Sequence, residues 1–294
     1  MDSATTTNVL SFDLEHWHSA TLLAGSVTDP VDRIRESTRI VLDLLARHGI
    51  SATFFVVGQV AEEYPALIER VRAEGHEIAS HGQTHTPLFN LDPASFRREL
   101  RRSVAAIEDA AGITPVGFRA PNFSITHETP WAVDVLREEG FRYDSSVFPV
   151  RTPMYGVSGA PVRPYCPVPG KPFEEGLIDA ESLFELPLAV FHPRIRLPVA
   201  GGFYARLLPR AVLSRGIRTL NARNVPATIY FHPWEFNSAV PLKGIPRHER
   251  FVSFHGIDGL RSKLDSLLES FAFGTAKALR ERTAGPRPTP ARAP

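Results

Sequence analysis

The stretch EIASHGQTH at residues 77–85 joins a short apolar run to two histidines, His81 and His85. The run is typical of the end of a buried β-strand. Histidines four residues apart in a helical or tight turn lie on one side of the chain, so both rings can point a nitrogen at one ion. Such a pair also occurs by chance on solvated helices, so by itself it is weak evidence for a metal site.

The rest of the chain alternates short β-branched or aromatic runs with longer amphipathic stretches. This pattern is typical of a β/α protein with a parallel sheet. We expect seven strands, over residues 8–12, 52–57 and 76–80 and ending at Arg119, at Asp144, near Leu186 and at Phe231. Helices are expected to start at Asp29-Pro30 and stop at Gly49, and to cover residues 64–74, 92–111, 126–139, 209–223 and 257–282. We interpret residues 147–176 as a proline-rich loop and residues 201–203 as a tight turn.

The composition describes an ordinary globular protein of 294 residues, with 43% hydrophobic residues and a net charge of +1. This balance gives no field that would attract nucleic acid or anionic lipid. Cys166 is the only cysteine, which excludes an internal disulfide and a thiolate zinc cluster. No apolar run is long enough for a membrane span, and the first residues do not resemble a leader, so we expect a cytoplasmic protein.

Five of the expected strands end in residues that can do chemistry. These residues are Asp13 with Glu15, His81, Arg119, Asp144 and His232. Each has an ordinary explanation by itself, as a cap, an ion-pair partner or a satisfied core histidine. In β/α barrels, however, the carboxyl ends of the strands meet at one mouth, where active sites are built. Their joint occurrence there favours a catalytic site.

The number of possible metal ligands indicates which chemistry this site could perform. Catalytic zinc takes three protein ligands, and His81 and His85 with one carboxylate complete that set. Asp13 and Glu15 are two residues apart and share a face of the strand, so one can bind the ion while the other takes a proton from water. Arg119 would orient the free carboxylate.

His232, across the mouth, could protonate a leaving group. Asp144 would raise the pKa of His232 if the two side chains are in contact.

An ordered set of motifs resembles the NodB-type polysaccharide deacetylases of carbohydrate esterase family four. The likeness looks closest to the subgroup encoded with exosortase-linked exopolysaccharide loci, and it covers most of the chain. The motifs are SFDLE at 11–15, ATFFVVG at 52–58, GHEIASHG at 75–82 with His85, GFRAPNFS at 117–124, YDSS at 143–146, GGFY at 201–204 and FHPWE at 231–235.

The resemblance implies a distorted seven-stranded β/α barrel that removes N-acetyl groups from a polysaccharide or its precursor. It implies Asp13 as general base, Arg119 as the residue that orients it and His232 as general acid tuned by Asp144. The backbone N–H of Asn122 would stabilise the oxyanion, and the histidines would bind a divalent ion, usually zinc. Residues 1–282 would form one domain with a family-specific segment from about residue 200. The polar, proline-rich composition of residues 283–294 predicts a disordered tail.

Three positions depart from the family pattern. Leu14 stands where most members have a second aspartate, so the third metal ligand must be Glu15; the alternative is that Asp13 binds the ion and Glu15 is the base. Residues 16–18, His-Trp-His, either line the sugar site or are structural. Tyr230 stands where the family often has a leucine that contacts the acetyl methyl group.

Two other functions compete with the deacetylase. One is a related amidohydrolase that acts on a small cyclic amide, and the motifs at 201–234 argue against it. The other is a non-catalytic sugar-binding relative, which would have lost ligands or the acid; this chain retains them all.

Overall fold

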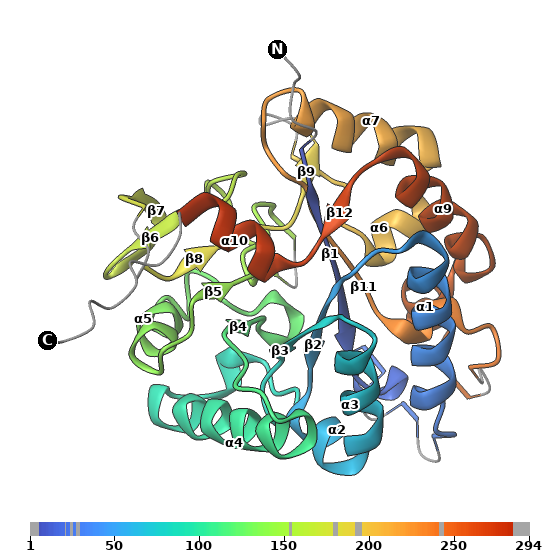
Figure 1. Ribbon diagram of the computed structural model, residues 1–294, viewed down its shortest axis with the longest axis horizontal. Coiled ribbons are helices and arrows are strands. Elements are labelled where there is room, and N and C mark those ends of the chain that lie inside the picture. Colours follow the sequence, from blue (N-terminus) through green and yellow to red (C-terminus); the bar gives the residue numbers. More distant parts are fainter. Residues whose placement is uncertain are drawn as a thin grey trace, which may run out of the picture.

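The centre of the molecule is one curled parallel sheet (Figure 1). The computed structural model describes residues 6–20, 22–23, 26–27, 30–152, 155–178, 182–191, 196–240 and 244–284. Seven strands follow one another in the order β11-β1-β2-β3-β4-β5-β8, and an eighth, β12, pairs with β1. A single bridge from Leu188 to Thr228 links the chain after β8 to β11, so the sheet curls into a distorted barrel.

All seven predicted strands are present. Their bounds are β1 Asn8–Leu14, β2 Thr53–Val56, β3 Glu77–Ser80, β4 Gly117–Phe118, β5 Tyr143–Asp144, β8 Phe184–Glu185 and β11 Thr228–Phe231. The predicted seven-stranded β/α barrel is therefore confirmed.

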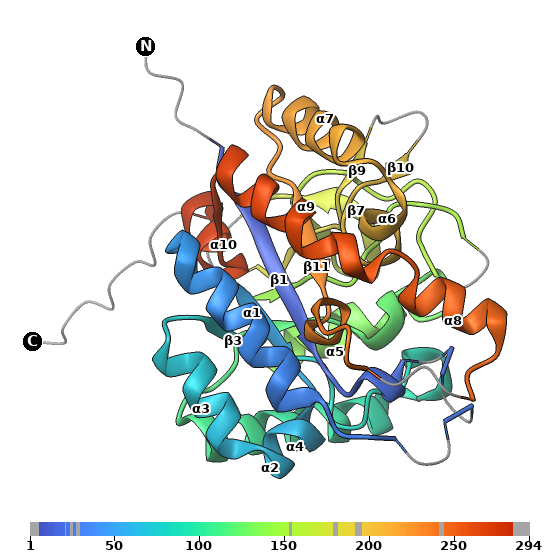
Figure 2. The ribbon, with the colours of Figure 1, turned by 90° about the vertical axis from the view of Figure 1, so that its right-hand side faces the viewer.

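Helices cover the outside of this sheet, and Figures 1 and 2 show α1 to α4 on one side of β1, β2 and β3. The bounds are α1 Ile34–His48, α2 Gly58–Glu63, α3 Pro65–Ala73, α4 Pro93–Ala111, α5 Trp131–Glu138, α6 Gly202–Leu207, α7 Arg210–Asn221, α8 Arg247–Phe254, α9 Ile257–Ser270 and α10 Ala276–Ala284. Within the described ranges, no helix is both long enough and apolar enough to cross a bilayer.

Side-chain alternation along β1 separates the packed core from the site. Phe12 faces the helices, where its ring packs on the rings of Phe54 and Phe236. The ring centres are 5.2 Å and 6.1 Å apart, respectively. Ser11 and Asp13 share the opposite face, because successive residues of a strand point to opposite sides of the sheet. The same strand thus anchors the hydrophobic core and directs a carboxylate into the barrel.

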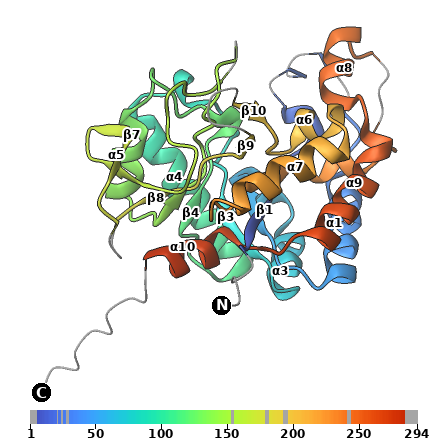
Figure 3. The same cartoon turned by 90° about the horizontal axis from the view of Figure 1, so that it is seen from above.

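The predicted helix over residues 257–282 is wrong because the chain breaks between α9 and α10 to form β12, Phe273–Gly274. β12 pairs with the first two residues of β1, where β2 has not yet begun. Buried backbone N–H and C=O groups require hydrogen-bond partners, and β12 supplies them to the first residues of β1. Helical periodicity in the sequence does not reveal such a strand. Figure 3 shows α10 beyond it, close to the start of β1.

Other differences are local. The predicted loop at 147–176 contains a hairpin of β6 Cys166–Val168 and β7 Lys171–Gly176. Further along, β9 Val190–Phe191 pairs antiparallel with β10 Leu197–Pro198. Within the predicted turn at 201–203, Gly201 bridges to Tyr230 and α6 begins at Gly202.

Three helix or tail boundaries also differ. The first helix begins at Ile34 rather than at Pro30, and Asp29 lies outside the described residues. The helix predicted over residues 126–139 begins at Trp131. α10 continues two residues into the predicted tail, of which residues 285–294 lie outside the described part.

Asn8 joins the start of β1 to three other segments. Its side-chain Oδ1 accepts from the backbone N of Ala227 at 2.9 Å and from Asn221 Nδ2 at 2.7 Å, and its Nδ2 donates to the carbonyl of Ala272 at 3.1 Å. We expect Asn8→Ala to lower the free energy of unfolding by roughly 1–3 kcal/mol, because buried donors lose their acceptor. Urea denaturation measures the change. The matched control Asn90→Ala, at an exposed position, should change the free energy of unfolding by less than about 0.5 kcal/mol. Equal effects of the two substitutions would contradict the linking role of Asn8.

Candidate active site

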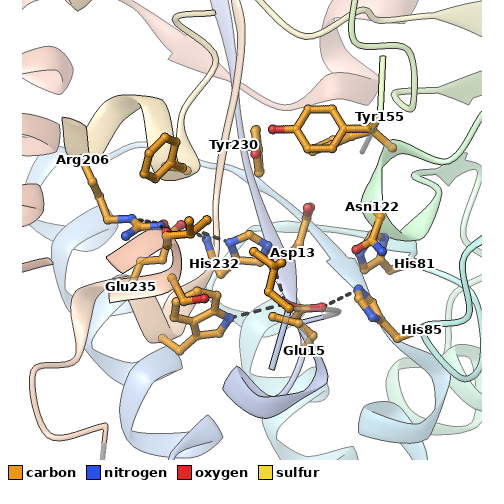
Figure 4. Close-up of a pocket in the computed structure, with 18 of the residues that line it drawn as sticks. Asp13, Glu15, His81, His85, Asn122, Tyr155, Arg206, Tyr230, His232 and Glu235 are labelled. Atoms are coloured by element: carbon orange, nitrogen blue, oxygen red, sulfur yellow. Dashed lines mark hydrogen bonds and ion pairs between the residues drawn. The ribbon is translucent and has the colours of Figure 1, made fainter. Parts of the chain in front are cut away.

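The carboxyl ends of the strands open into a pocket of about 450 Å³ (Figure 4). Six of the predicted site residues line it: Asp13, Glu15, His81, His85, Asn122 and His232. They come from the ends of β1, β3 and β11 and from the segments that follow β3 and β4. The other two predicted residues, Arg119 and Asp144, are not among the lining residues, but Arg119 binds Asp13.

Glu15, His81 and His85 form a three-residue group whose ligand atoms lie within 4.8 Å of one another. His81 Nδ1 lies 2.7 Å from the carbonyl oxygen of Arg119. A carbonyl only accepts, so Nδ1 carries the proton and Nε2 is left for an ion. His85 adopts a left-handed backbone conformation, with φ of 58°, and its Nε2 lies 2.5 Å from Glu15 Oε2.

The charge states of these residues suit a metal ion. Burial alone would raise the pKa of Glu15, but the surrounding imidazoles, His85 foremost, lower it to about 2. Burial lowers the pKa of His81 to about 4. Both groups therefore favour the deprotonated form that binds metals. A buried carboxylate and two imidazoles that converge on one point fit a divalent ion.

Asp13 is held by a different partner. Its Oδ1 accepts from Arg119 Nη1 at 2.6 Å, and both side chains are buried. Arg119 Nη1 also donates to Ser11 Oγ at 3.0 Å, and its Nε donates to the carbonyl of Ser145 at 3.0 Å. The guanidinium lies 4.1 Å from the ring centre of Phe55. This geometry groups Glu15 with the histidines and leaves Asp13, oriented by Arg119, beside them.

His232 faces the pocket from the other side. Its Nδ1 lies 3.1 Å from Glu235 Oε2, and its Nε2 lies 3.6 Å from Glu15 Oε1. Its ring stacks on Trp234 with centres 5.0 Å apart. Burial would lower the pKa of His232, but the hydrogen bond to Glu235 and the nearby charge of Glu15 raise it to about 9. The Glu235 carboxylate thus favours the protonated form of the imidazole.

The carboxylate that pairs with His232 is Glu235. Asp144, which we expected to tune His232 if the two side chains are in contact, pairs with Ser146 instead. Asp144 Oδ1 accepts from Ser146 Oγ at 2.5 Å. Ser146 Oγ in turn accepts from the backbone N of Ala120 at 2.8 Å. Burial raises the pKa of Asp144 to about 6. Asp144 therefore supports the segment that leads from β4 to Asn122, whose backbone is left-handed with φ of 56°.

Glu235 is fixed by Arg206, a residue that the sequence did not single out. Arg206 Nε donates to Glu235 Oε1 at 2.7 Å, and its two Nη atoms donate to the carbonyls of Val252 and His255 at 2.8 and 3.0 Å. Glu235 Oε2 also accepts from the backbone N of His232 at 2.9 Å. A glutamate three residues into a short helical turn is a capping signal, so its position was readable in FHPWE. Arg206 had no such signal.

Residues 16–18 have structural contacts. Trp17 Nε1 donates to the carbonyl of Val31 at 2.9 Å, and its buried ring packs with Phe254 of α8. His16 Nε2 lies 3.3 Å from Glu63 Oε2. Tyr230 does line the pocket, and its ring packs edge-on against Phe123 at 4.7 Å. An aromatic wall therefore stands where the family often has a leucine.

Two family models match adjoining parts of the chain. Residues 25–143 match polysaccharide deacetylase, and residues 145–281 match a domain of unknown function, DUF3473. A chitooligosaccharide deacetylase from a Bradyrhizobium species is 41% identical over 97 residues, which are 33% of this chain and 42% of that protein. The chain spans less than half the length of the curated relatives it matches.

Solved structures share the fold along the whole chain. A protein from Mycobacterium smegmatis, provisionally described as a polysaccharide deacetylase, is similar with a TM-score of 0.60 at 21% identity, over 100% of this chain and 97% of that one. The allantoinase PuuE is similar with a TM-score of 0.63 at 14% identity, over 98% and 94% of the two chains. Because the sequence identities are this low, the similarity shows only a shared fold, which is a curled parallel half-barrel.

The grouping of Glu15 with the two histidines predicts a metal content. We expect purified protein to contain about one divalent ion per chain, and the His81→Ala, His85→Ala double variant to lose it, because one carboxylate is too few ligands. Elemental analysis of both proteins measures this. His48→Ala, at a histidine paired with Asp265, is the control that should keep the ion. A double variant with a full complement of metal would refute the site.

The contact between Glu235 and His232 predicts that a substitution of Glu235 by a residue of the same size lowers turnover. Glu235→Gln keeps the size of the side chain but removes the charge that pairs with His232 and Arg206. We expect turnover to fall by about tenfold or more, since positioned acid–base groups contribute roughly 10²–10⁴-fold. The control Glu138→Gln, at an exposed position on α5, should keep the wild-type rate. Steady-state kinetics with metal content measured in parallel makes the comparison; equal rates for both variants would remove Glu235 from the site.

Proposed function

We propose that this chain, of which residues 25–143 match the polysaccharide deacetylase model, hydrolyses N-acetyl groups on N-acetylhexosamine units of a polysaccharide or its precursor. One observation carries the proposal. Within one pocket, Asp13 bound to Arg119 and His232 bound to Glu235 lie beside the Glu15, His81 and His85 group. A base, an acid and a candidate metal site are the parts that amide hydrolysis needs.

Glu15, His81 and His85 would hold a divalent ion, and zinc is our choice. Two imidazoles and one carboxylate are a common ligand set of catalytic zinc, with a further position left open. When bound, the ion supplies Lewis-acid chemistry, which lowers the pKa of water and polarises a carbonyl oxygen. The remaining work falls to the protein's own side chains.

Asp13 acts as the general base. Hydrolysis adds the oxygen of water to the carbonyl carbon, and Asp13 takes the proton that this water gives up. The bond of Asp13 Oδ1 to Arg119 aims the carboxylate into the pocket, because Arg119 is itself fixed by Ser11 and Ser145. The backbone N–H of Asn122 would donate to the oxyanion that develops on the carbonyl oxygen.

His232 acts as the general acid. When the C–N bond breaks, the nitrogen of the sugar needs a proton, and His232 Nε2 faces the pocket with Glu235 behind Nδ1. The products are acetate and a free amine. Glu235 and Arg206 are positioning residues in this scheme, since they act through His232.

The substrate class rests on the aromatic lining and on the relatives. Phe123, Tyr155, Phe203, Tyr230 and Trp234 line the pocket, and such rings pack well against the apolar faces of sugars. The relative from Bradyrhizobium is named as a deacetylase of chitooligosaccharides. The motifs at 201–204 and 231–235 resemble the exosortase-linked subgroup, so we assign the chain to exopolysaccharide biosynthesis.

Release of acetate from N-acetylated hexosamine chains tests the proposal. We expect Asp13→Asn and His232→Ala each to lower turnover by about 10²-fold or more while the metal is retained. Glu138→Gln serves again as the variant with the wild-type rate. Reaction with small cyclic amides or O-acetyl esters alone would overturn the substrate class, and near-normal turnover of either variant would remove that residue from the mechanism.

A further inference from the structure

Asp144 and Glu185 are two buried acidic residues that do not line the catalytic pocket. They are register partners on the neighbouring parallel strands β5 and β8, which Figure 1 shows side by side. Side chains of register partners point to the same face of a sheet. A hydrogen bond joins the two carboxyl groups. Acidic residues are almost never buried this completely unless they are paired, so the contact between them requires a physical explanation.

A hydrogen bond between two carboxyl groups requires a proton on one of them, because an ionised carboxylate only accepts. Asp144 Oδ1 accepts from Ser146 Oγ. In the described part of the chain, however, no N–H or O–H group of an ordinary donor binds Asp144 Oδ2, although this atom is buried. A buried acceptor without a donor is costly. The O–H of a protonated Glu185 would supply the missing donor.

The surroundings favour one retained proton on this pair. Burial raises the pKa of Glu185 well above its ordinary value, and the negative charge of Asp144 raises it further. Burial also raises the pKa of Asp144, to about 6, but the hydrogen bond from Glu185 acts in the opposite direction. Glu185 is therefore the partner that holds the proton, and Asp144 is the partner that accepts it.

Neighbouring side chains do not replace this proton. Arg119 is the cation that acts on both carboxyl groups, but its guanidinium donates to three residues on β1 and after β5 and to neither member of the pair. The other titratable neighbour is Tyr165, whose backbone pairs with that of Glu185 and whose O–H donates to the carbonyl of Pro172 at 2.8 Å. Burial and the nearby Glu185 raise the pKa of Tyr165, so this side chain stays neutral.

The outer oxygens of the pair hold the chain that follows β5. Glu185 Oε1 accepts from the backbone N of Val147 at 3.0 Å, and its partner carboxylate accepts from Ser146 Oγ. Ser145, the residue before these two, binds Arg119 through both its carbonyl and its hydroxyl, at 3.0 Å each. The pair therefore fixes the backbone on which the orientation of Arg119 depends.

We propose that Glu185 keeps a proton at neutral pH and shares it with Asp144 Oδ2 in a hydrogen bond. The resulting pair, with a single negative charge, holds Ser145, which fixes Arg119 against the base Asp13. Glu185 touches no reacting atom, so it is a positioning residue. Its effect on turnover rests on the proposed function, whereas the presence of the proton does not.

Infrared spectroscopy of the full chain tests the proton directly. At neutral pH, the wild-type protein should show the C=O stretching band of a protonated carboxylic acid, and the contribution of the pair should be missing in Glu185→Gln. The control Glu138→Gln, at an exposed position on α5, should keep this band. A difference spectrum of wild type and Glu185→Gln that lacks the band would overturn the proposal.

The pH dependence of unfolding gives a second measurement. In the unfolded chain Glu185 ionises near its ordinary pKa of 4.5, whereas in the folded chain its pKa is raised. Above a pH of about 5, unfolding therefore releases a proton, and the stability that this proton contributes is lost as the pH rises. In urea denaturation, the unfolding equilibrium constant of wild type should rise by up to about tenfold per pH unit relative to that of Glu185→Gln. The same pH dependence in both proteins would overturn the proposal.

Turnover tests the positioning role. Glu185→Gln replaces the O–H donor by an amide N–H, so the metal-loaded full chain should keep most of the wild-type kcat. In Glu185→Ala, kcat should fall by about tenfold or more with little change in KM, because misplacing a positioned group costs up to about 10²-fold. The Asp144→Asn, Glu185→Gln double variant sets two N–H groups against each other and should lose as much. Metal content and urea denaturation show that each variant is loaded and folded.

The outcomes separate the two proposals. A wild-type kcat in Glu185→Ala, or a loss in Glu185→Gln equal to that in Glu185→Ala, would overturn the positioning role while the deacetylase stands. Absence of acetate release from N-acetylated hexosamine chains by metal-loaded wild type would overturn the proposed function. The infrared band would then still decide whether Glu185 carries the proton.

Discussion

The buried guanidinium of Arg119 joins the parts of this site that must be aligned. Its side chain binds Asp13 and Ser11 on β1 and both the carbonyl and the hydroxyl of Ser145 after β5, at distances from 2.6 to 3.0 Å. Its backbone carbonyl fixes the ring of His81, which follows β3. A buried charge is costly without partners, so these bonds are also a condition for burying the arginine at all. The candidate base and a candidate metal ligand are thus positioned by one residue.

The second half of the chain supplies the other side of the site. α6 brings Arg206 to Glu235, and the backbone of α8 and of His255 accepts the remaining Arg206 donors. Lys263 of α9 donates to the carbonyls at the end of α6, which holds that short helix in place. The region that matches a domain of unknown function therefore does more than cover the barrel, because it positions His232.

The sequence predicted the barrel and most of the site because parallel strands carry their chemistry at one end. Short apolar runs located all seven strands, and the residues that followed them, such as Asp13, His81 and His232, converge as expected. The sequence did not single out Glu235 as the partner of His232, because contacts depend on side-chain direction and not on order in the chain. Arg206 was missed for the same reason. β12 was missed because helical periodicity on both sides of it concealed a two-residue strand.

The pairing of β12 with β1 also has a consequence for the order of folding. Asn8 and Ala272, which are hydrogen bonded, are 264 positions apart in the chain. β11, which also pairs with β1, is likewise far from β1 in sequence. Contacts of such high sequence separation carry a large loop-closure entropy and form late. During synthesis β1 must wait for β11 and β12 to emerge before it acquires all its neighbours. A product that stalls before residue 273 would therefore expose an unfinished edge at the start of the strand that carries Asp13.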